Sequence, residues 1–187
     1  IAYAPYPAYR TIVEKGKMGE LLFIWTICGA YFALASLIKA ESFRPFLMTK
    51  HVLVLLTGAF LGYALVVFLL WMFAICLKKR FLIKGLAIAW GYTLIPTVAW
   101  FFFTSFSYLL IPPPRTETAL GILFSFFYLV VSSVLLFWKV ELCYLTLRFG
   151  LRVDLIRSVG VFMVIIPFVI IYSLVMYRVG VFRVPFL

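Results

Sequence analysis

The chain has 187 residues, of which 66% are apolar and 12% charged, whereas soluble domains are about 45–50% apolar and about 25% charged. This composition excludes an ordinary soluble domain and indicates a polytopic membrane protein. A formal charge of +11 would favour nucleic-acid binding in a soluble chain. In a membrane chain the cations instead report orientation and lipid contact, so no nucleic-acid partner is predicted.

Five continuous apolar stretches are each long enough to cross a bilayer, which takes about 20 residues. They are too long and too uniformly apolar for barrel strands, and only helices satisfy their own backbone groups in lipid. We therefore predict an all-α bundle of five transmembrane helices in a single domain, residues 1–187, with no separate soluble domain. The predicted spans are 20–38, 52–77, 85–111, 119–138 and 159–177.

Small residues and prolines mark particular places in these spans. In the second span, Gly58 and Gly62 form a GxxxG pattern, which favours close packing within the molecule and has dimerisation as its alternative. The third and fifth spans contain Pro96 and Pro167, where a missing backbone donor predicts kinks or broken turns.

Lys and Arg distribute unequally between the two sides that five crossings define. Short cytoplasmic loops carry more Lys and Arg than the loops on the other side of the membrane. The N-terminus belongs to the side with more Lys and Arg, so we predict a cytoplasmic N-terminus and an outside C-terminus. The richer side carries Arg10, Lys15, Lys17, Lys78, Lys79, Arg80, Lys84, Lys139, Arg148, Arg152 and Arg157. The other side carries Lys39, Arg44, Lys50, Arg115, Arg178 and Arg183.

Few residues could carry catalysis or hold a metal. The chain has six acidic residues and one histidine, His51, and most of them fall at span ends or in loops. It lacks the HExxH, P-loop and GxSxG patterns, and its three cysteines have no CxxC spacing. We therefore predict no enzyme activity, no cofactor and no metal, with His51 as an interfacial anchor and the cysteines as small packing residues.

The most informative polar stretch follows Trp138. Its charges recur within apolar helical spacing, and Glu141 and Arg148 lie two turns apart on one helix face. Asp154 and Arg157 are spaced for an i,i+3 pair. With the loop cations Lys78, Lys79 and Arg80, the residues Lys139, Glu141, Arg148, Arg152, Asp154 and Arg157 are candidate polar or headgroup contacts. They predict a basic collar that binds anionic headgroups or a partner protein, and the alternative is an ordinary cytoplasmic loop.

The third span contains Gly91-Tyr92-Thr93-Leu94-Ile95-Pro96, a Gly-Tyr-[Ser/Thr]-Leu-x-Pro pattern that resembles the Yip domain of Ypt-interacting membrane proteins. The segment 7–14 resembles the pre-membrane segment of bacterial members, and Trp138-Lys139 with Gly150-Leu151-Arg152 resembles their region between the fourth and fifth helices. The resemblance implies a five-helix protein of the bacterial inner membrane with a cytoplasmic N-terminus. It also implies an accessory subunit of a larger membrane machine. The N-terminal Asp-Leu-Tyr-Gly-Pro motif of eukaryotic members is absent.

Physical properties of the same motif predict a polar hinge. Gly91 permits close helix approach, Tyr92 can carry its hydroxyl to a neighbouring helix, and Pro96 frees a carbonyl one turn earlier. The alternative is that these residues only shape a kink.

These features favour a non-enzymatic scaffold or accessory subunit that contacts lipids and other membrane subunits. The alternative is a small permease in which the breaks at Pro96 and Pro167 and the region of Glu141 line a path. A lipid-modifying enzyme would need an acid, histidine or metal cluster at one depth, and the sequence offers none.

Overall fold

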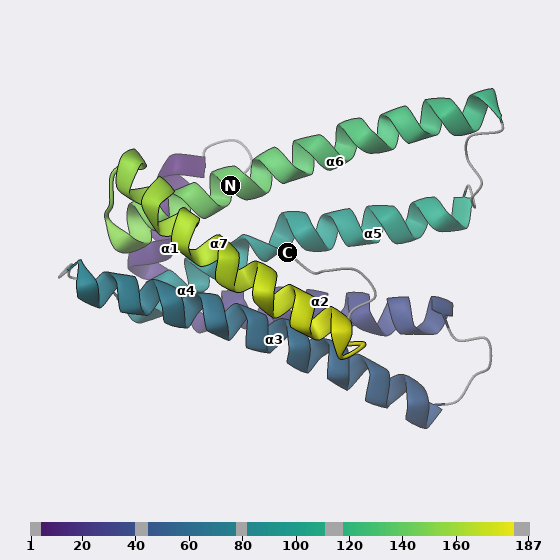
Figure 1. The fold of residues 1–187 in the computed structure, drawn as a ribbon, viewed down its shortest axis with the longest axis horizontal. Coiled ribbons are helices and arrows are strands. Elements are labelled where there is room, and N and C mark those ends of the chain that lie inside the picture. Colours follow the sequence, from purple (N-terminus) through teal and green to yellow (C-terminus); the bar gives the residue numbers. More distant parts are fainter. Residues whose placement is uncertain (1–4, 40–44, 78–81, 111–117, 182–187) are drawn as a thin grey trace.

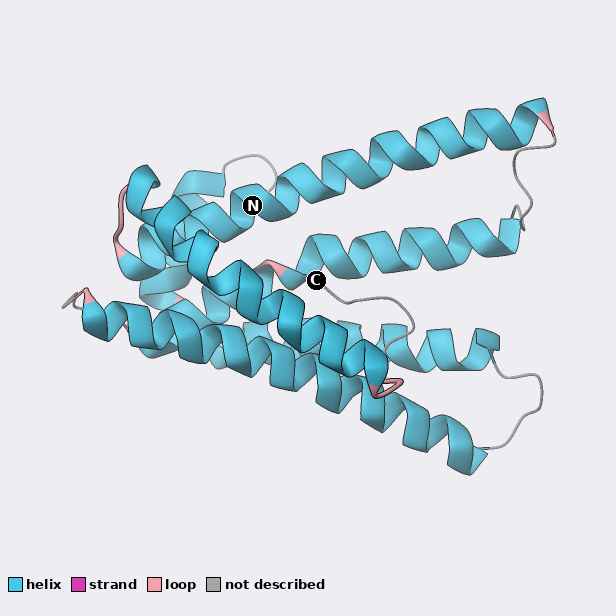
Figure 2. Cartoon of the chain, in the orientation of Figure 1, coloured by secondary structure: helices cyan, strands magenta, loops and turns pink. Residues whose placement is uncertain are grey.

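The computed structural model describes residues 5–39, 45–77, 82–110 and 118–181. Every regular element within these ranges is a helix (Figure 2). The elements in chain order are α1 (Pro5–Lys15), α2 (Met18–Lys39), α3 (Pro45–Cys76), α4 (Ile83–Tyr92), α5 (Leu94–Leu110), α6 (Ala119–Leu145), the π-helix η1 (Thr146–Leu151) and α7 (Leu155–Arg178).

Five helical segments are long and apolar enough to cross a membrane, which confirms the predicted all-helical class and the predicted number of spans. The third of them is made of two helices, α4 and α5. The segments are Met18–Ser36, Thr49–Cys76, Ile83–Ser107, Ala119–Leu151 and Leu155–Arg178.

The fourth span is longer than the predicted 119–138, because α6 and η1 continue the helix to Leu151. Lys139 therefore lies within a helix and not in a connection between helices. The charges of Lys139 and Glu141 interrupt the apolar run in the sequence, but the helix continues because its inward face is buried. Leu142 and Leu147 are fully buried beyond that point.

The sequence analysis did not predict α1. Tyr9, Ile12 and Val13 lie on one face, at the i, i+3, i+4 spacing of an amphipathic helix, and pack into the core. Arg10 and Glu14 lie outside and form a salt bridge of 3.3 Å. Burial of the apolar face holds this short helix, which would be marginal in isolation, against α4, α6 and η1.

The core is centred on α4. Its residues Leu86, Ile88 and Ala89 are fully buried. Leu86 packs with buried residues of α3, η1 and α7, whereas Ile88 and Ala89 pack with α1 and α6. From Gly85 onward α4 is therefore packed among other elements, whereas Ile83 at its start is 51% exposed.

The helix ends carrying most of the described cations gather with α1, α4 and η1 at one end of the bundle, which we term the basic end (Figure 1). Its cations are Arg10, Lys15, Lys17, Lys84, Arg148, Arg152 and Arg157. Toward the opposite end, α6 runs apart from α2, α3 and α7 (Figure 1), whereas α5 stays in contact with α2, whose Tyr31 stacks on Phe101 and lies 3.4 Å from the Ser105 hydroxyl. In the most apolar part of the fourth span only 6% of the residues are buried, against 39% in the third.

Candidate functional site

The third span is interrupted at Thr93, between α4 and α5. Pro96 has no N–H, and its ring crowds the carbonyl four residues earlier, which belongs to Tyr92. Thr93 is 1% exposed, and both its N–H and its hydroxyl donate to the carbonyl of Trp90, at 3.0 and 2.7 Å. The predicted break is therefore present, three residues before Pro96.

Side chains from three other elements donate to the carbonyls of α4 just before the break. The carbonyl of Ala89 accepts from the Tyr9 hydroxyl of α1 at 3.3 Å, and the Thr146 hydroxyl of η1 shares its proton between this carbonyl, at 3.2 Å, and that of Leu142, at 2.9 Å. The Tyr63 hydroxyl of α3 donates to the carbonyl of Ala87 at 2.6 Å. Burial also raises the pKa of the Tyr9 phenol above its ordinary value. These bonds fix α4 in place in surroundings that hold little water.

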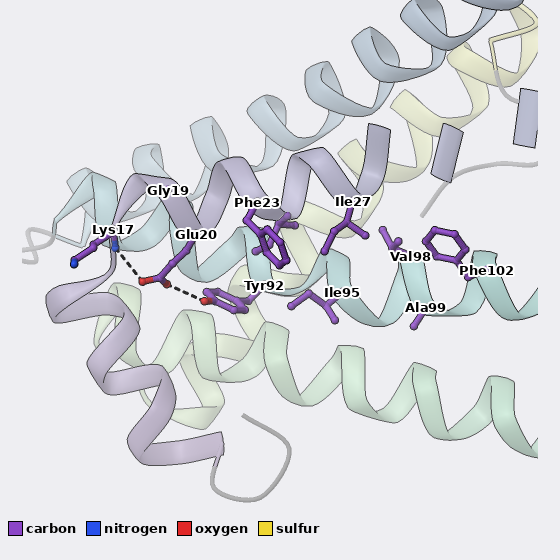
Figure 3. Close-up of a pocket in the computed structure, with 11 residues that line it drawn as sticks. Lys17, Gly19, Glu20, Phe23, Ile27, Tyr92, Ile95, Val98, Ala99 and Phe102 are labelled. Carbon is purple, nitrogen blue, oxygen red and sulfur yellow. Dashed lines mark hydrogen bonds between the residues drawn. The ribbon is translucent and has the colours of Figure 1, made fainter. Parts of the chain in front are cut away.

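Tyr92 connects the break to α2. Its hydroxyl donates to Oε2 of Glu20 at 2.8 Å, while Oε1 of Glu20 accepts from the backbone N–H of Lys17 at 3.2 Å (Figure 3). Glu20 thus caps the start of α2 and holds the hinge tyrosine with the same carboxylate. Gly91 allows the close approach, since a Cβ there would lie 2.5 Å from Cδ1 of Leu21.

A groove of about 690 Å³ lies between α2 and α5, and we term it the α2–α5 groove. Lys17, Glu20 and Tyr92 stand at its polar end, and the rest of its wall is apolar, including Phe23, Ile95 and Phe102 (Figure 3). The groove begins at the basic end and follows the helices toward the opposite end. Its shape and lining suit an apolar chain better than a polar solute.

The GxxxG of α3 packs within the molecule, against α7. The Tyr172 hydroxyl donates to the carbonyl of Gly58. A Cβ on Gly62 would lie 2.8 Å from the Tyr172 ring. The tyrosine ring therefore occupies the space that the two glycines leave open. Pro167, the other predicted bend, lies inside α7, which continues through it from Leu155 to Arg178.

A second cavity, of about 490 Å³, is enclosed by α3, α4, α5, α6 and α7, and we term it the Lys139 cavity. Lys139 is the one charged residue of its lining, which includes Gly62, Trp90, Val140 and Phe162. Ionisable residues within membrane-crossing helices are rare, which makes Lys139 a candidate functional residue. The structure thus gives Lys139 a different setting from the other collar residues.

Three arginines of the collar region meet at the surface of the basic end. Arg10 of α1, Arg148 of η1 and Arg152 line a hollow of about 350 Å³ together with Glu14. The Arg148 guanidinium donates to the Tyr144 hydroxyl at 2.6 Å and lies over the Tyr6 ring, 5.2 Å from its centroid. Arg152 has a left-handed backbone, with φ of 53°.

The remaining collar residues do not form the predicted pairs. In the described part of the chain, no ion pair joins Glu141 to Arg148 or Asp154 to Arg157. Arg148 bonds to Tyr144 instead, Glu141 is exposed on α6, and Asp154 is the residue that precedes α7. Lys78, Lys79 and Arg80 lie outside the described residues.

The sequence analysis did not identify the residues that form hydrogen bonds around the break in the third span. Glu20 appeared there only as a span boundary, and Tyr9, Tyr63 and Thr146 were not singled out. A signal was present for Tyr9, because Tyr9, Ile12 and Val13 already show the spacing of a buried helix face. Glu20 also stands three residues after Lys17, the spacing at which a glutamate reaches back to cap a helix.

The described side chains include no group of three His, Cys, Asp or Glu residues placed to hold a metal ion. Cys28 and Cys143 are buried and Cys76 is exposed, all three as free thiols. The arrangement offers hydrogen bonding, charge and apolar cavities. A scan of protein-family models and searches of curated proteins and of solved structures found no match to this chain.

Proposed function

We propose that this chain is a non-enzymatic membrane scaffold or accessory subunit of the Yip type, with a cytoplasmic N-terminus, an outside C-terminus and a bacterial inner-membrane location. The observation that carries the proposal is the contrast between the packed basic end and the unpacked α6. Elements from the whole chain pack around α4, whereas α6 from Ala119 to Trp138 packs mainly on α5.

The exposed surface of α6 supports a partner helix. Leu123, Phe126 and Phe137 are 70%, 67% and 75% exposed, and their spacing places them on one face of the helix. Helices associate in lipid through close packing, because lipid tails are as apolar as leucine. A helix with one neighbour over most of its length has room for a second one, and large aromatic side chains are common anchors at interfaces.

The charges support the orientation and the lipid contacts. The basic end holds the cations that the positive-inside rule assigns to the cytoplasmic side. The hollow lined by Arg10, Arg148 and Arg152 presents three guanidinium groups suited to phosphate oxygens. Anionic headgroups of the cytoplasmic leaflet are therefore the expected ligands of this surface.

Photo-crosslinking in native membranes tests the subunit proposal. A photoreactive residue at Leu123 or Phe137 of α6 should give a defined protein adduct. The control is Met163, which is 69% exposed on α7, a helix that already packs on α3. Adducts at the α6 positions and none at Met163 are expected. The proposal fails if no α6 position gives a protein adduct and the gently solubilised protein runs as a lone monomer.

The broken third span favours a second candidate, a small permease component. Secondary transporters place substrate at discontinuous helices near the middle of the membrane, and here cavities flank the break. A path would pass Tyr92 and not Glu141, which lines none of the described cavities. Proteoliposomes would then show flux of protons, K⁺ or small amphiphilic ions that Tyr92→Phe alters. Flux equal to that of empty liposomes would exclude the permease.

A further inference from the structure

The Lys139 cavity has one cation and otherwise mostly apolar walls. Leu136, Lys139, Val140 and Cys143 form one face of α6 at the i, i+3, i+4, i+7 spacing, and all four line the cavity. The opposite walls come from α3 and α7, with Gly62 and Tyr172 among them. Its volume of about 490 Å³ lies within the range of about 300–1,000 Å³ that small ligands occupy.

The position of Lys139 along α6 sets the depth of the cation. Twenty residues separate it from Ala119, where α6 begins, and a rise of 1.5 Å per residue makes that distance about 30 Å. This equals the thickness of the hydrocarbon layer. With Ala119 at one boundary of the hydrocarbon layer, Lys139 therefore lies at the other boundary, near the basic end.

The rest of the cavity extends from that boundary into the hydrocarbon layer. Phe162, Ile166 and Val169 follow one another along α7 away from the basic end, and all three line the cavity. A ligand that fills it needs an anionic group at the boundary and an apolar chain directed into the membrane. An anionic phospholipid has both, with the charge at the correct depth.

A second polar group lies beside the same lysine. Lys139 also lines a smaller cavity of about 270 Å³ between α5 and α6, together with Thr97. The Thr97 side chain is 9% exposed, and its hydroxyl has no hydrogen-bond partner in the described part of the chain. A buried hydroxyl without a partner is unfavourable, and an ester or glycerol oxygen of a bound lipid would satisfy it.

We propose that the Lys139 cavity binds one anionic phospholipid, with the phosphate at Lys139 and one acyl chain along the wall formed by α3 and α7. The bound lipid fills the space between α6 and α7 and connects α6 to the wall formed by α3 and α7. This role does not depend on the proposed subunit function, since the site lies inside a single chain.

Native mass spectrometry of the detergent-purified, delipidated protein tests the proposal. The probes are palmitoyl-oleoyl phosphatidylglycerol and palmitoyl-oleoyl phosphatidylcholine. Lys139→Gln should weaken binding of the first phosphatidylglycerol by about fivefold and leave phosphatidylcholine unchanged. Lys139→Arg should restore binding. Lys84→Gln is the matched control, because it removes the same charge at the basic end but outside the cavity.

A fourth variant tests the location of the acyl chain. Ile166→Trp places a large side chain in the cavity and should weaken binding of both lipids. The proposal is overturned if Lys139→Gln binds phosphatidylglycerol as wild type does, or if Lys84→Gln weakens it equally. It is also overturned if Ile166→Trp changes neither lipid, or if oleate displaces phosphatidylglycerol at equal concentration, which would indicate a free fatty acid.

Discussion

Gly85 lies where α4 meets α1, and replacing it with alanine tests how the basic end is assembled. A Cβ at this position would lie 2.2 Å from the carbonyl oxygen of Val13 and 3.1 Å from its carbonyl carbon. Both atoms belong to backbone, so no side-chain rotation can relieve the clash. Ordinary contact begins near 3.4 Å, and α1 must therefore move by about 1 Å.

Three contributions determine the expected change in the free energy of unfolding. Overpacking of this kind costs about 1–3 kcal/mol. The displacement of α1 also breaks the 3.3 Å hydrogen bond from Tyr9 to Ala89, at about 0.5–1.5 kcal/mol. Alanine offsets about 0.5–1 kcal/mol, because it is a better helix former than glycine. Gly85→Ala should therefore destabilise the protein by about 1–3 kcal/mol and loosen α1.

The assay is thermal or SDS-induced unfolding in detergent micelles, followed by helical circular dichroism, together with limited proteolysis after Lys15. Gly160→Ala is the matched control, since a Cβ on Gly160 of α7 meets nothing within 4 Å. We expect the control to be neutral or slightly more stable, and Gly85→Ala to be less stable and cleaved faster near α1. Equal stability and equal cleavage of the two variants would refute the packing described for α1.

Further substitutions test the hydrogen bonds of the site, and each is measured in the same unfolding assay. Tyr92→Phe removes the bond to Glu20 and should cost about 1–2 kcal/mol, because the bond is charge-assisted but only partly buried. The cost should largely vanish in a Glu20→Ala background, which removes the acceptor, and additive costs would exclude the contact. Tyr172→Phe removes the bond to the Gly58 carbonyl and should cost about 1 kcal/mol, whereas no loss would show that ring packing alone holds α7. Burial raises the pKa of Tyr9 in the folded protein above the ordinary value of 10.0. The stability that its protonated phenol contributes is therefore fully present below about pH 10 and is lost as the pH rises further. Tyr9→Phe should reduce this alkaline loss, and an unchanged pH profile would contradict the burial of the phenol.

Local pattern was enough to predict the break in the third span and the packing role of the glycines. Pro96 lacks a backbone donor wherever it stands in a helix, so an interruption close to it follows from covalent structure. Pro167 has the same chemistry but lies within the continuous α7. The difference lies in the surroundings, since side chains of α1, α3 and η1 donate to the carbonyls just before the Pro96 break, whereas Pro167 is exposed.

Charge pattern was a poorer guide to the collar. Glu141 and Arg148 share a face in an ideal α-helix, but the π-helix η1 begins between them, and Arg148 bonds to Tyr144. Sequence spacing assumes one helical geometry, and a change in the number of residues per turn rotates every later side chain. The same change brings Arg148 toward Tyr6 of α1.

The sequence by itself determined the helical class and the five spans. In lipid, backbone groups must be satisfied within each segment, so continuous apolar runs of sufficient length can only be helices. Only the tertiary structure showed that Tyr92 reaches Glu20, that α1 covers α4, and that Lys139 lines a cavity among five helices and does not lie in a loop. These features join residues far apart in the chain, and a periodic pattern such as that of Tyr9, Ile12 and Val13 indicates a buried face without identifying the element that covers it.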